Sequence, residues 1–144
     1  MKEILNVARV RFPALSENEG FARIVTAGFL MPLGVTPADL ADVKTMVSEA
    51  VTNAIVHGYR GMKGKSCVLL LELRFYADRT LVISVTDHGK GIPNVQEAME
   101  PFFTTDREGE RSGMGLPIMK AFSDSFRLVS RPGCTKVTMR KKLP

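Results

Sequence analysis

Three polar side chains share one face of a predicted helix. Glu49, Asn53 and His57 follow one another at intervals of four residues, so at about 100° per residue they form a stripe that points away from Val47 and Val51. Asparagine competes for backbone hydrogen bonds inside a helix, so local stability does not account for Asn53. The stripe predicts a functional site, with an ordinary solvated helix face as the alternative interpretation.

The stretch Asp87-His88-Gly89-Lys90-Gly91-Ile92 directly follows a predicted strand. A carboxylate at the end of a strand can accept a hydrogen bond from the exocyclic amine of a base. Gly89 and Gly91 allow the backbone to approach a planar ligand closely. This stretch therefore favours a base-binding loop, and a tight loop with an Asx turn is the structural alternative.

A second glycine-rich stretch, Arg111-Ser112-Gly113-Met114-Gly115-Leu116, leads into a predicted helix. Glycines at a helix N-terminus expose successive amide hydrogens, and the helix dipole favours anions, so the stretch is typical of a phosphate cradle. Arg111 adds a fixed positive charge. A flexible loop before a helix is the alternative. The sequence contains no P-loop pattern, and the dinucleotide-binding fingerprint fits poorly because no strand precedes these glycines.

Together the three stretches predict a site for one nucleoside triphosphate with its metal. The Asn53 carboxamide oxygen suits Mg²⁺, which keeps several waters and bridges phosphates. Zinc is disfavoured because the stripe lacks the two-histidine spacing of a zinc protease. Glu49, one turn earlier, is placed to polarise a hydroxyl or a water for in-line attack on the γ-phosphate, and Arg111 to stabilise charge on that phosphate.

The elements that must position these groups are α+β in character. We expect a two-layer sandwich, in which helices cover one face of a mixed, mostly antiparallel sheet, as a single domain over residues 1–144. A capping box at Ser16 and Glu19 opens the first helix, and Thr36-Pro37 caps the second, which ends at Gly58. The expected strands cover residues 4–12, 67–76, 80–86, 126–130 and 135–140. Helices are expected to begin at residues 16, 37 and 114; the first is buried through Phe21, Ile24, Val25 and Phe29, and the third has Pro117 in its first turn. A short helix at 95–100 and a mobile lid at 101–112 are also expected.

Composition places the chain among soluble globular proteins. It has 144 residues, of which 44% are hydrophobic and 24% charged. No apolar run approaches the roughly 20 residues of a membrane span, and the start lacks a signal-peptide layout. Cys67 and Cys134 indicate packing rather than a disulfide or a metal site. We therefore expect a cytoplasmic protein that does not contact membranes.

The charge pattern indicates the kind of partner. The net charge is +5, but lysines and arginines are scattered among fifteen acids, and tryptophan is absent. Nucleic-acid surfaces cluster basic residues on one face, with aromatic side chains for single strands. Solvated faces are therefore the favoured account, and we expect no direct contact with nucleic acid. The basic excess favours anionic ligands or acidic protein partners.

The three motifs resemble, in order, the N box and the two glycine boxes of the ATPases shared by gyrase, Hsp90, histidine kinases and MutL, the GHKL superfamily. Within it the chain resembles the small serine kinases of sporulating Gram-positive bacteria that are also anti-sigma factors. The resemblance covers nearly the whole chain and is closest over residues 16–23, 48–59, 103–105 and 110–115.

The resemblance implies a Bergerat ATP-binding fold, ATP and Mg²⁺ as cofactors, and a homodimer. It also implies two partners. One is a sporulation sigma factor that the protein binds and inhibits, and the other is an anti-anti-sigma protein of the STAS type that it phosphorylates on serine.

By matching position, the resemblance makes Glu49 the catalytic base and Asn53 the Mg²⁺ ligand. Asp87 contacts adenine, and Gly89, Gly91 and Ile92 shape the base pocket. The residues over the phosphates are Thr104, Thr105, Arg111, Ser112, Gly113, Met114, Gly115 and Leu116. Arg23 is a candidate partner contact, with an ordinary exposed arginine as the alternative.

Three departures from the family pattern stand out: His88 replaces the usual acid, Pro117 removes a backbone amide, and residues 136–142 are unusually basic. A histidine-kinase catalytic domain is disfavoured because no residues remain for a phosphoacceptor helix, and an ATP-driven clamp because none remain for a transducer domain. The main rival is a nucleotide-gated sigma-binding module without kinase activity. Retention of Glu49 favours catalysis.

Overall fold

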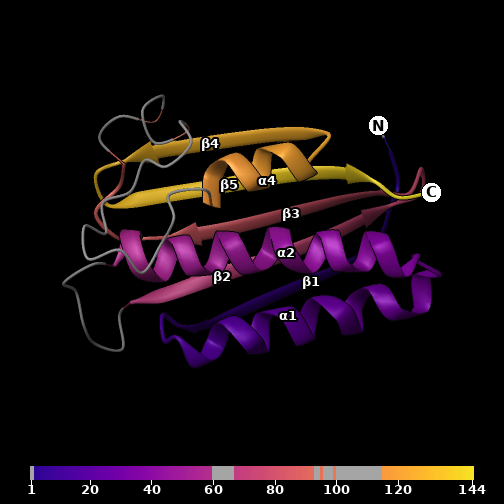
Figure 1. Cartoon of the computed structure of the whole chain (residues 1–144), viewed down its shortest axis with the longest axis horizontal. Coiled ribbons are helices and arrows are strands. Elements are labelled where there is room, and N and C mark those ends of the chain that lie inside the picture. The colour runs from indigo at the N-terminus through magenta and orange to yellow at the C-terminus, as the bar shows by residue number, and fades with distance from the viewer. Residues whose placement is uncertain (1, 60–66, 93–94, 96–98, 100–114) are drawn as a thin grey trace.

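The computed structural model describes residues 2–59, 67–92, 95, 99 and 115–144. Its five strands form one sheet in the order β1-β2-β3-β5-β4, and three helices lie in one layer over one face of that sheet (Figure 1). The elements are β1 (Ile4–Pro13), α1 (Glu17–Leu30), α2 (Pro37–Asn53), β2 (Val68–Tyr76), β3 (Thr80–Asp87), α4 (Gly115–Phe122), β4 (Ser125–Arg131) and β5 (Cys134–Lys142).

The α+β two-layer sandwich is confirmed. All four pairings within this sheet are antiparallel, so the described strands include no parallel pair and the sheet is simpler than the mixed one expected. The expected lid at 101–112, most of the short helix at 95–100 and the loop at 61–65 lie outside the described residues. No helix in the described part is long and apolar enough to cross a membrane.

Strict alternation in β2 sets the two faces of the sheet. Leu69, Leu71, Leu73 and Phe75 are buried against the helices, while the residues between them are only partly buried. Such alternation is expected of an antiparallel sheet that is covered on one side. The core of the protein therefore lies between this sheet face and the helical layer.

Helix α2 lies in the middle of the helical layer, between α1 and α4 (Figure 1). Its start is as predicted, because the Thr36 side chain accepts a hydrogen bond from the Asp39 amide at 3.1 Å and Pro37 occupies the first turn. Val43, Val47 and Val51 are fully buried. A π-helical turn, Ala54–Gly58, continues the helix.

The start of α1 differs from the prediction. Ser16 has helical backbone angles and its side chain makes no capping hydrogen bond, so the predicted capping box is wrong. The Glu19 carboxylate instead accepts a hydrogen bond from Ser48 and forms an ion pair with Arg23 at 2.9 Å. Ser48 on α2 and Arg23 on the next turn of α1 are therefore the partners of the Glu19 carboxylate, which in a capping box would accept a hydrogen bond from the Ser16 amide.

The buried face of α1 is also rotated from the one expected. Phe29 is buried as expected, but Phe21 and Ile24 are 46% and 73% exposed. The other buried residues of α1 are Ala22, Thr26 and Leu30. The ring of Phe21 makes an edge-to-face contact with the ring of Phe12, with the two centroids 6.0 Å apart. Ala22 packs against the core because its small side chain allows a close approach that a large ring would prevent.

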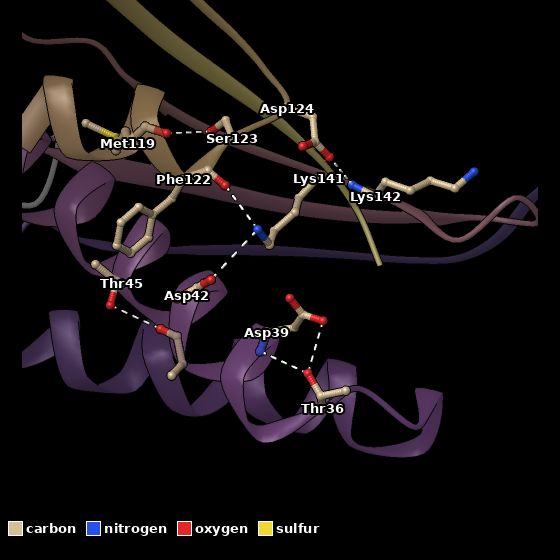
Figure 2. A network of polar contacts seen from close by, with 11 residues as sticks. Thr36, Asp39, Asp42, Thr45, Met119, Phe122, Ser123, Asp124, Lys141 and Lys142 are labelled. Atoms are coloured by element: carbon tan, nitrogen blue, oxygen red, sulfur yellow. Dashed lines mark hydrogen bonds and ion pairs between the residues drawn. The ribbon is translucent and has the colours of Figure 1, made fainter. Parts of the chain in front are cut away.

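Helix α4 is fixed at its C-terminal end by β5 (Figure 2). The Lys141 side chain is only 14% exposed, and its Nζ donates a hydrogen bond to the Phe122 carbonyl at 3.2 Å and lies 3.9 Å from the Asp42 carboxylate on α2. A cation near the last carbonyls of a helix also interacts favourably with the helix dipole. Lys141 therefore connects α4, β5 and α2.

Replacing Lys141 by methionine should lower the free energy of unfolding by about 1–2 kcal/mol, because the Phe122 carbonyl and the Asp42 carboxylate lose their cation. Urea denaturation monitored by circular dichroism measures the change. Lys136→Met is the matched control on the same strand, since the Lys136 side chain is exposed, and should change stability by less than about 0.5 kcal/mol. Equal effects of the two substitutions would contradict the role of Lys141.

Candidate nucleotide site

Asp87 ends strand β3 as a buried carboxylate. It is 4% exposed, and its Oδ1 accepts a hydrogen bond from the Gly89 amide at 2.9 Å. Burial raises the pKa of the Asp87 carboxyl, and the Gly89 hydrogen bond and neighbouring His88 offset only part of this rise. The hydrogen bond of an Asx turn is therefore present. A tight turn alone, however, does not require its carboxylate to be buried.

The end of α2 meets the Asp87 loop in direct backbone contact. A Cβ on Gly58 would lie 2.8 Å from Asp87 Oδ1, and a Cβ on Gly89 would lie 1.8 Å from the Gly58 carbonyl oxygen. The Lys90 amide donates a hydrogen bond to the same carbonyl at 2.8 Å. The predicted C-cap role of Gly58 is wrong, since Tyr59 is the cap and Gly58 has no left-handed backbone. Glycine is needed at position 58 because the Asp87 carboxylate occupies the space that a side chain at that position would fill.

Tyr59 is a residue of this region that the sequence reasoning missed. Its hydroxyl accepts a hydrogen bond from the His88 amide at 2.8 Å and donates one to the Val68 carbonyl at 2.7 Å. Burial raises the pKa of this hydroxyl. A buried tyrosine needs a hydrogen-bond partner, but both partners come from other parts of the chain. In the sequence, the position of Tyr59 directly after Gly58 was the only indication that it belongs to this region.

The far side of the loop is attached to the β4–β5 hairpin. Gly91 has a φ of +83°, and a Cβ there would lie 2.4 Å from the Arg131 carbonyl oxygen. The Ile92 amide donates a hydrogen bond to Ser130 Oγ at 2.7 Å. Gly91 is therefore needed both for its backbone angle and for its close contact, and the loop from Asp87 to Ile92 is held from both sides.

Glu49 lies near the start of α4. A Cβ on Gly115 would lie 3.1 Å from Glu49 Oε2, so this carboxylate is next to the helix N-terminus that was predicted to cradle phosphates. Glu49, Asn53 and His57 are all partly buried, which excludes a fully solvated stripe. The structure thus brings the α2 stripe together with Gly115, and the end of the same helix together with Asp87.

The remaining predicted residues divide into three groups. Leu116 is buried in the core, so only its backbone could contact a ligand. Arg23 lies on α1, paired with Glu19. His88, which departs from the family pattern and was not predicted as a site residue, is exposed. The others lie outside the described residues: Thr104, Thr105, Arg111, Ser112, Gly113 and Met114.

The described residues contain no group of three or more His, Cys, Asp or Glu side chains that could hold a metal ion. Asn53 lies on the same helix face as Glu49, and its carboxamide oxygen is a donor of the kind that Mg²⁺ takes. The two cysteines are free, with Cys67 buried and Cys134 partly buried.

The fold and this arrangement define a class of protein. Residues 12–141 match the family model described as the histidine kinase-like ATPase domain, and the chain belongs to that family. Within it, the chain is a member of the anti-sigma F factor group. It is 46% identical to the anti-sigma F factor of Clostridium perfringens over 96% of this chain and 97% of the relative, and 44% identical to that of Clostridium acetobutylicum over 95% and 94%.

Solved structures agree on the fold. The chain is similar to the structure of the RsbU and RsbW domains of a Mycobacterium tuberculosis protein, with a TM-score of 0.70 and 22% identity over 96% of this chain and 32% of that one. It is also similar to a chain of the SiaB-SiaC complex from Pseudomonas aeruginosa, with a TM-score of 0.60 and 13% identity over 99% and 92%. At these identities the likeness concerns the fold alone.

The contact of Gly89 with Gly58 predicts a large effect of one methyl group. Gly89→Ala should destabilise the protein by about 3 kcal/mol, because its Cβ has no room beside the Gly58 carbonyl. Gly28→Ala is the matched control, since nothing lies within 4 Å of a Cβ at that exposed helical position, and should raise stability by about 0.5–1 kcal/mol. Thermal and urea unfolding of both variants test this, and a Gly89→Ala protein as stable as the wild type would refute the close contact.

The raised pKa of Asp87 predicts a pH-dependent cost to folding. Because the folded pKa lies above the unfolded value, ionised Asp87 destabilises the fold at neutral pH and ceases to do so as pH falls through the folded pKa towards the unfolded one. Asp87→Asn should therefore be more stable than the wild type at pH 7, and the difference should shrink in acid. Urea titrations between neutral and acidic pH measure it, and a difference that grows in acid would reverse the assigned sign.

Proposed function

We propose that this chain is an ATP-dependent protein-serine kinase that also acts as an anti-sigma factor. In this proposal it binds and inhibits a sporulation sigma factor, sigma F, and phosphorylates a serine of the STAS-type anti-anti-sigma protein that opposes it. The names of the curated relatives and the histidine kinase-like ATPase domain support the anti-sigma and nucleotide-dependent parts.

One observation carries the kinase part of the proposal. Asp87 lies against Gly58, at the end of the helical run in which Glu49 lies against Gly115. Gly58 is the ninth residue after Glu49, which at about 1.5 Å per residue is roughly 13 Å along the helix. This is the scale of an extended nucleoside triphosphate. A base at Asp87 would therefore place its terminal phosphate near Glu49 and the N-terminus of α4.

The roles of the residues follow from their chemistry. Asp87 accepts a hydrogen bond from the exocyclic amine of adenine, and Gly89 and Gly91 keep the backbone close to the ring. The amides at the start of α4 bind phosphate oxygens. Glu49 takes the proton from the attacking serine hydroxyl.

Further residues complete the proposed site. Asn53 would hold Mg²⁺, which supplies charge neutralisation on the phosphates. Arg111 stabilises charge on the transferred phosphate, and Thr104, Thr105, Ser112, Gly113 and Met114 cover the phosphates. Arg23, exposed on α1, contacts the protein partner.

A homodimer is part of the proposal, and the sheet edge supports it. Among the described strands, β1 pairs only with β2, so its other edge is open. Ile4 and Leu5 at its start are 45% and 55% exposed. An open edge strand with exposed apolar side chains is a template for pairing with another chain, and a second copy of β1 would satisfy it.

Glu49→Gln should lower phosphoryl transfer by about 10²–10⁴-fold, the usual contribution of a general base, and leave ATP binding intact. The measurement combines Mg²⁺, labelled ATP and a candidate anti-anti-sigma protein, followed by mapping of the labelled serine and by ATP titration. Glu17→Gln, at an exposed position in the first turn of α1, is the control and should transfer at the wild-type rate.

The outcomes separate the two candidate functions. Equal transfer by the wild type and Glu49→Gln would remove Glu49 from catalysis. A wild-type protein that binds ATP and the sigma factor but labels no serine would favour the nucleotide-gated binding module. Asp87→Asn should weaken ATP binding itself, which distinguishes the base pocket from the catalytic end of the site.

A further inference from the structure

The face of the sheet that points away from the helices is strongly basic. The registers place alternate residues of each strand on this open face. Within the five strands, one acidic side chain, Glu72, stands there. The lysines and arginines on the same face are Arg9, Arg11, Arg74, Arg127, Arg131, Lys136, Arg140 and Lys142.

Part of this charge is compensated locally. Glu72 is paired with Arg9 at 2.5 Å and with Arg74 at 2.8 Å. Lys142 lies 3.6 Å from Asp78 in the β2–β3 turn. Five cations remain that are exposed and make no ion pair with any acid in the described part of the chain: Arg11, Arg127, Arg131, Lys136 and Arg140. We refer to these five as the basic sheet face.

Four members of the basic sheet face stand on two adjacent strands. Arg127 and Arg131 belong to β4, and Lys136 and Arg140 belong to the neighbouring β5. Strands lie about 4.8 Å apart, so these like charges repel one another across short distances. An anionic partner that covered them would relieve this repulsion and would be attracted from a distance.

Apolar side chains lie among these cations. Val129 is 49% exposed and stands opposite Lys136 in the β4–β5 register. Val82 stands opposite Arg140 and is only 7% exposed, which is consistent with coverage by the aliphatic stems of its arginine neighbours. The face therefore combines positive charge with one exposed valine and one recessed valine.

We propose that the basic sheet face docks an acidic segment of a protein partner, in which carboxylates alternate with aliphatic side chains. Charge complementarity supplies the steering, and arginine, which makes up four of the five cations, binds carboxylates in a bidentate manner. The face lies on the opposite side of the sheet from α1 and α2, so it is distinct from the nucleotide site and from the Arg23 surface. The proposal does not depend on kinase activity.

A protein segment fits this face better than other polyanions. Single-stranded nucleic acid binds through rows of aromatic side chains, and the described strands offer only Tyr76 on this face. A duplex backbone offers phosphates but nothing for Val129 to contact. Lipid binding requires several apolar side chains that project beyond the charges, whereas Val129 is the one large apolar side chain of β4 and β5 that is exposed.

The test uses a fluorescein-labelled synthetic peptide of alternating glutamate and valine, with the full chain, at about 0.15 M salt. Reversing two charges, Arg127→Glu with Arg140→Glu, should weaken binding of this peptide by tenfold or more. The matched control, Lys44→Glu with Lys120→Glu, makes the same change in net charge on the helical layer and should bind as the wild type does. Amide shifts in an NMR titration should map to β4 and β5.

Several results would overturn the proposal. These are equal weakening by the control pair, unchanged affinity of the Arg127/Arg140 variant, or shifts that map to α1 instead. Tighter binding of a duplex DNA or of phosphatidylserine vesicles, lost in the same variant, would assign the face to nucleic acid or lipid. If the reversed charges prevent folding, Arg127→Gln with Arg140→Gln replaces them, with circular dichroism as the check and a smaller loss of affinity expected.

Discussion

The contact between the last turn of the α2 run and the loop after β3 is the constraint on which the candidate nucleotide site depends. Gly58 has no side chain, so the Asp87 carboxylate can occupy that space, and Gly89 has none, so its loop can reach the Gly58 carbonyl. The two glycines therefore fix a buried carboxylate against a helix. A side chain at either position would separate the loop from the helix and move the carboxylate.

Helix α2 also carries Glu49 and Asn53, so the contact with the Asp87 loop fixes these two proposed site residues relative to Asp87. It is anchored through buried valines and lies between α1 and α4. It cannot shift without opening the core, so the groups along it keep a fixed spacing. Chemistry that consists mainly of positioning and charge neutralisation benefits from such a rigid element. Lys141 extends the same rigidity to α4, whose first residue lies next to Glu49.

The sequence was sufficient for the elements and insufficient for the contacts between them. The strand at 67–76 and the Thr36-Pro37 cap were predicted from local signals, and both were confirmed. Ser16 was assigned a capping box that Glu19 does not make, because Ser48, far along the chain, and Arg23 compete for that carboxylate. The site motifs were proposed from spacing and from the family resemblance, whereas Tyr59 was missed because its hydrogen-bond partners come from other segments. The charges of the open sheet face looked scattered along the chain, and only the strand registers bring them together.

The position of Tyr59 has an optical consequence. The chain has no tryptophan and only two tyrosines, and the phenol of one of them is hydrogen-bonded between the Val68 carbonyl and the loop next to Asp87. The other, Tyr76, lies at the far end of β2. Tyrosine emission from the unlabelled protein therefore arises from two well-separated points, one of which adjoins the loop proposed to bind the base. The protein carries its own spectroscopic reporter of events at that loop.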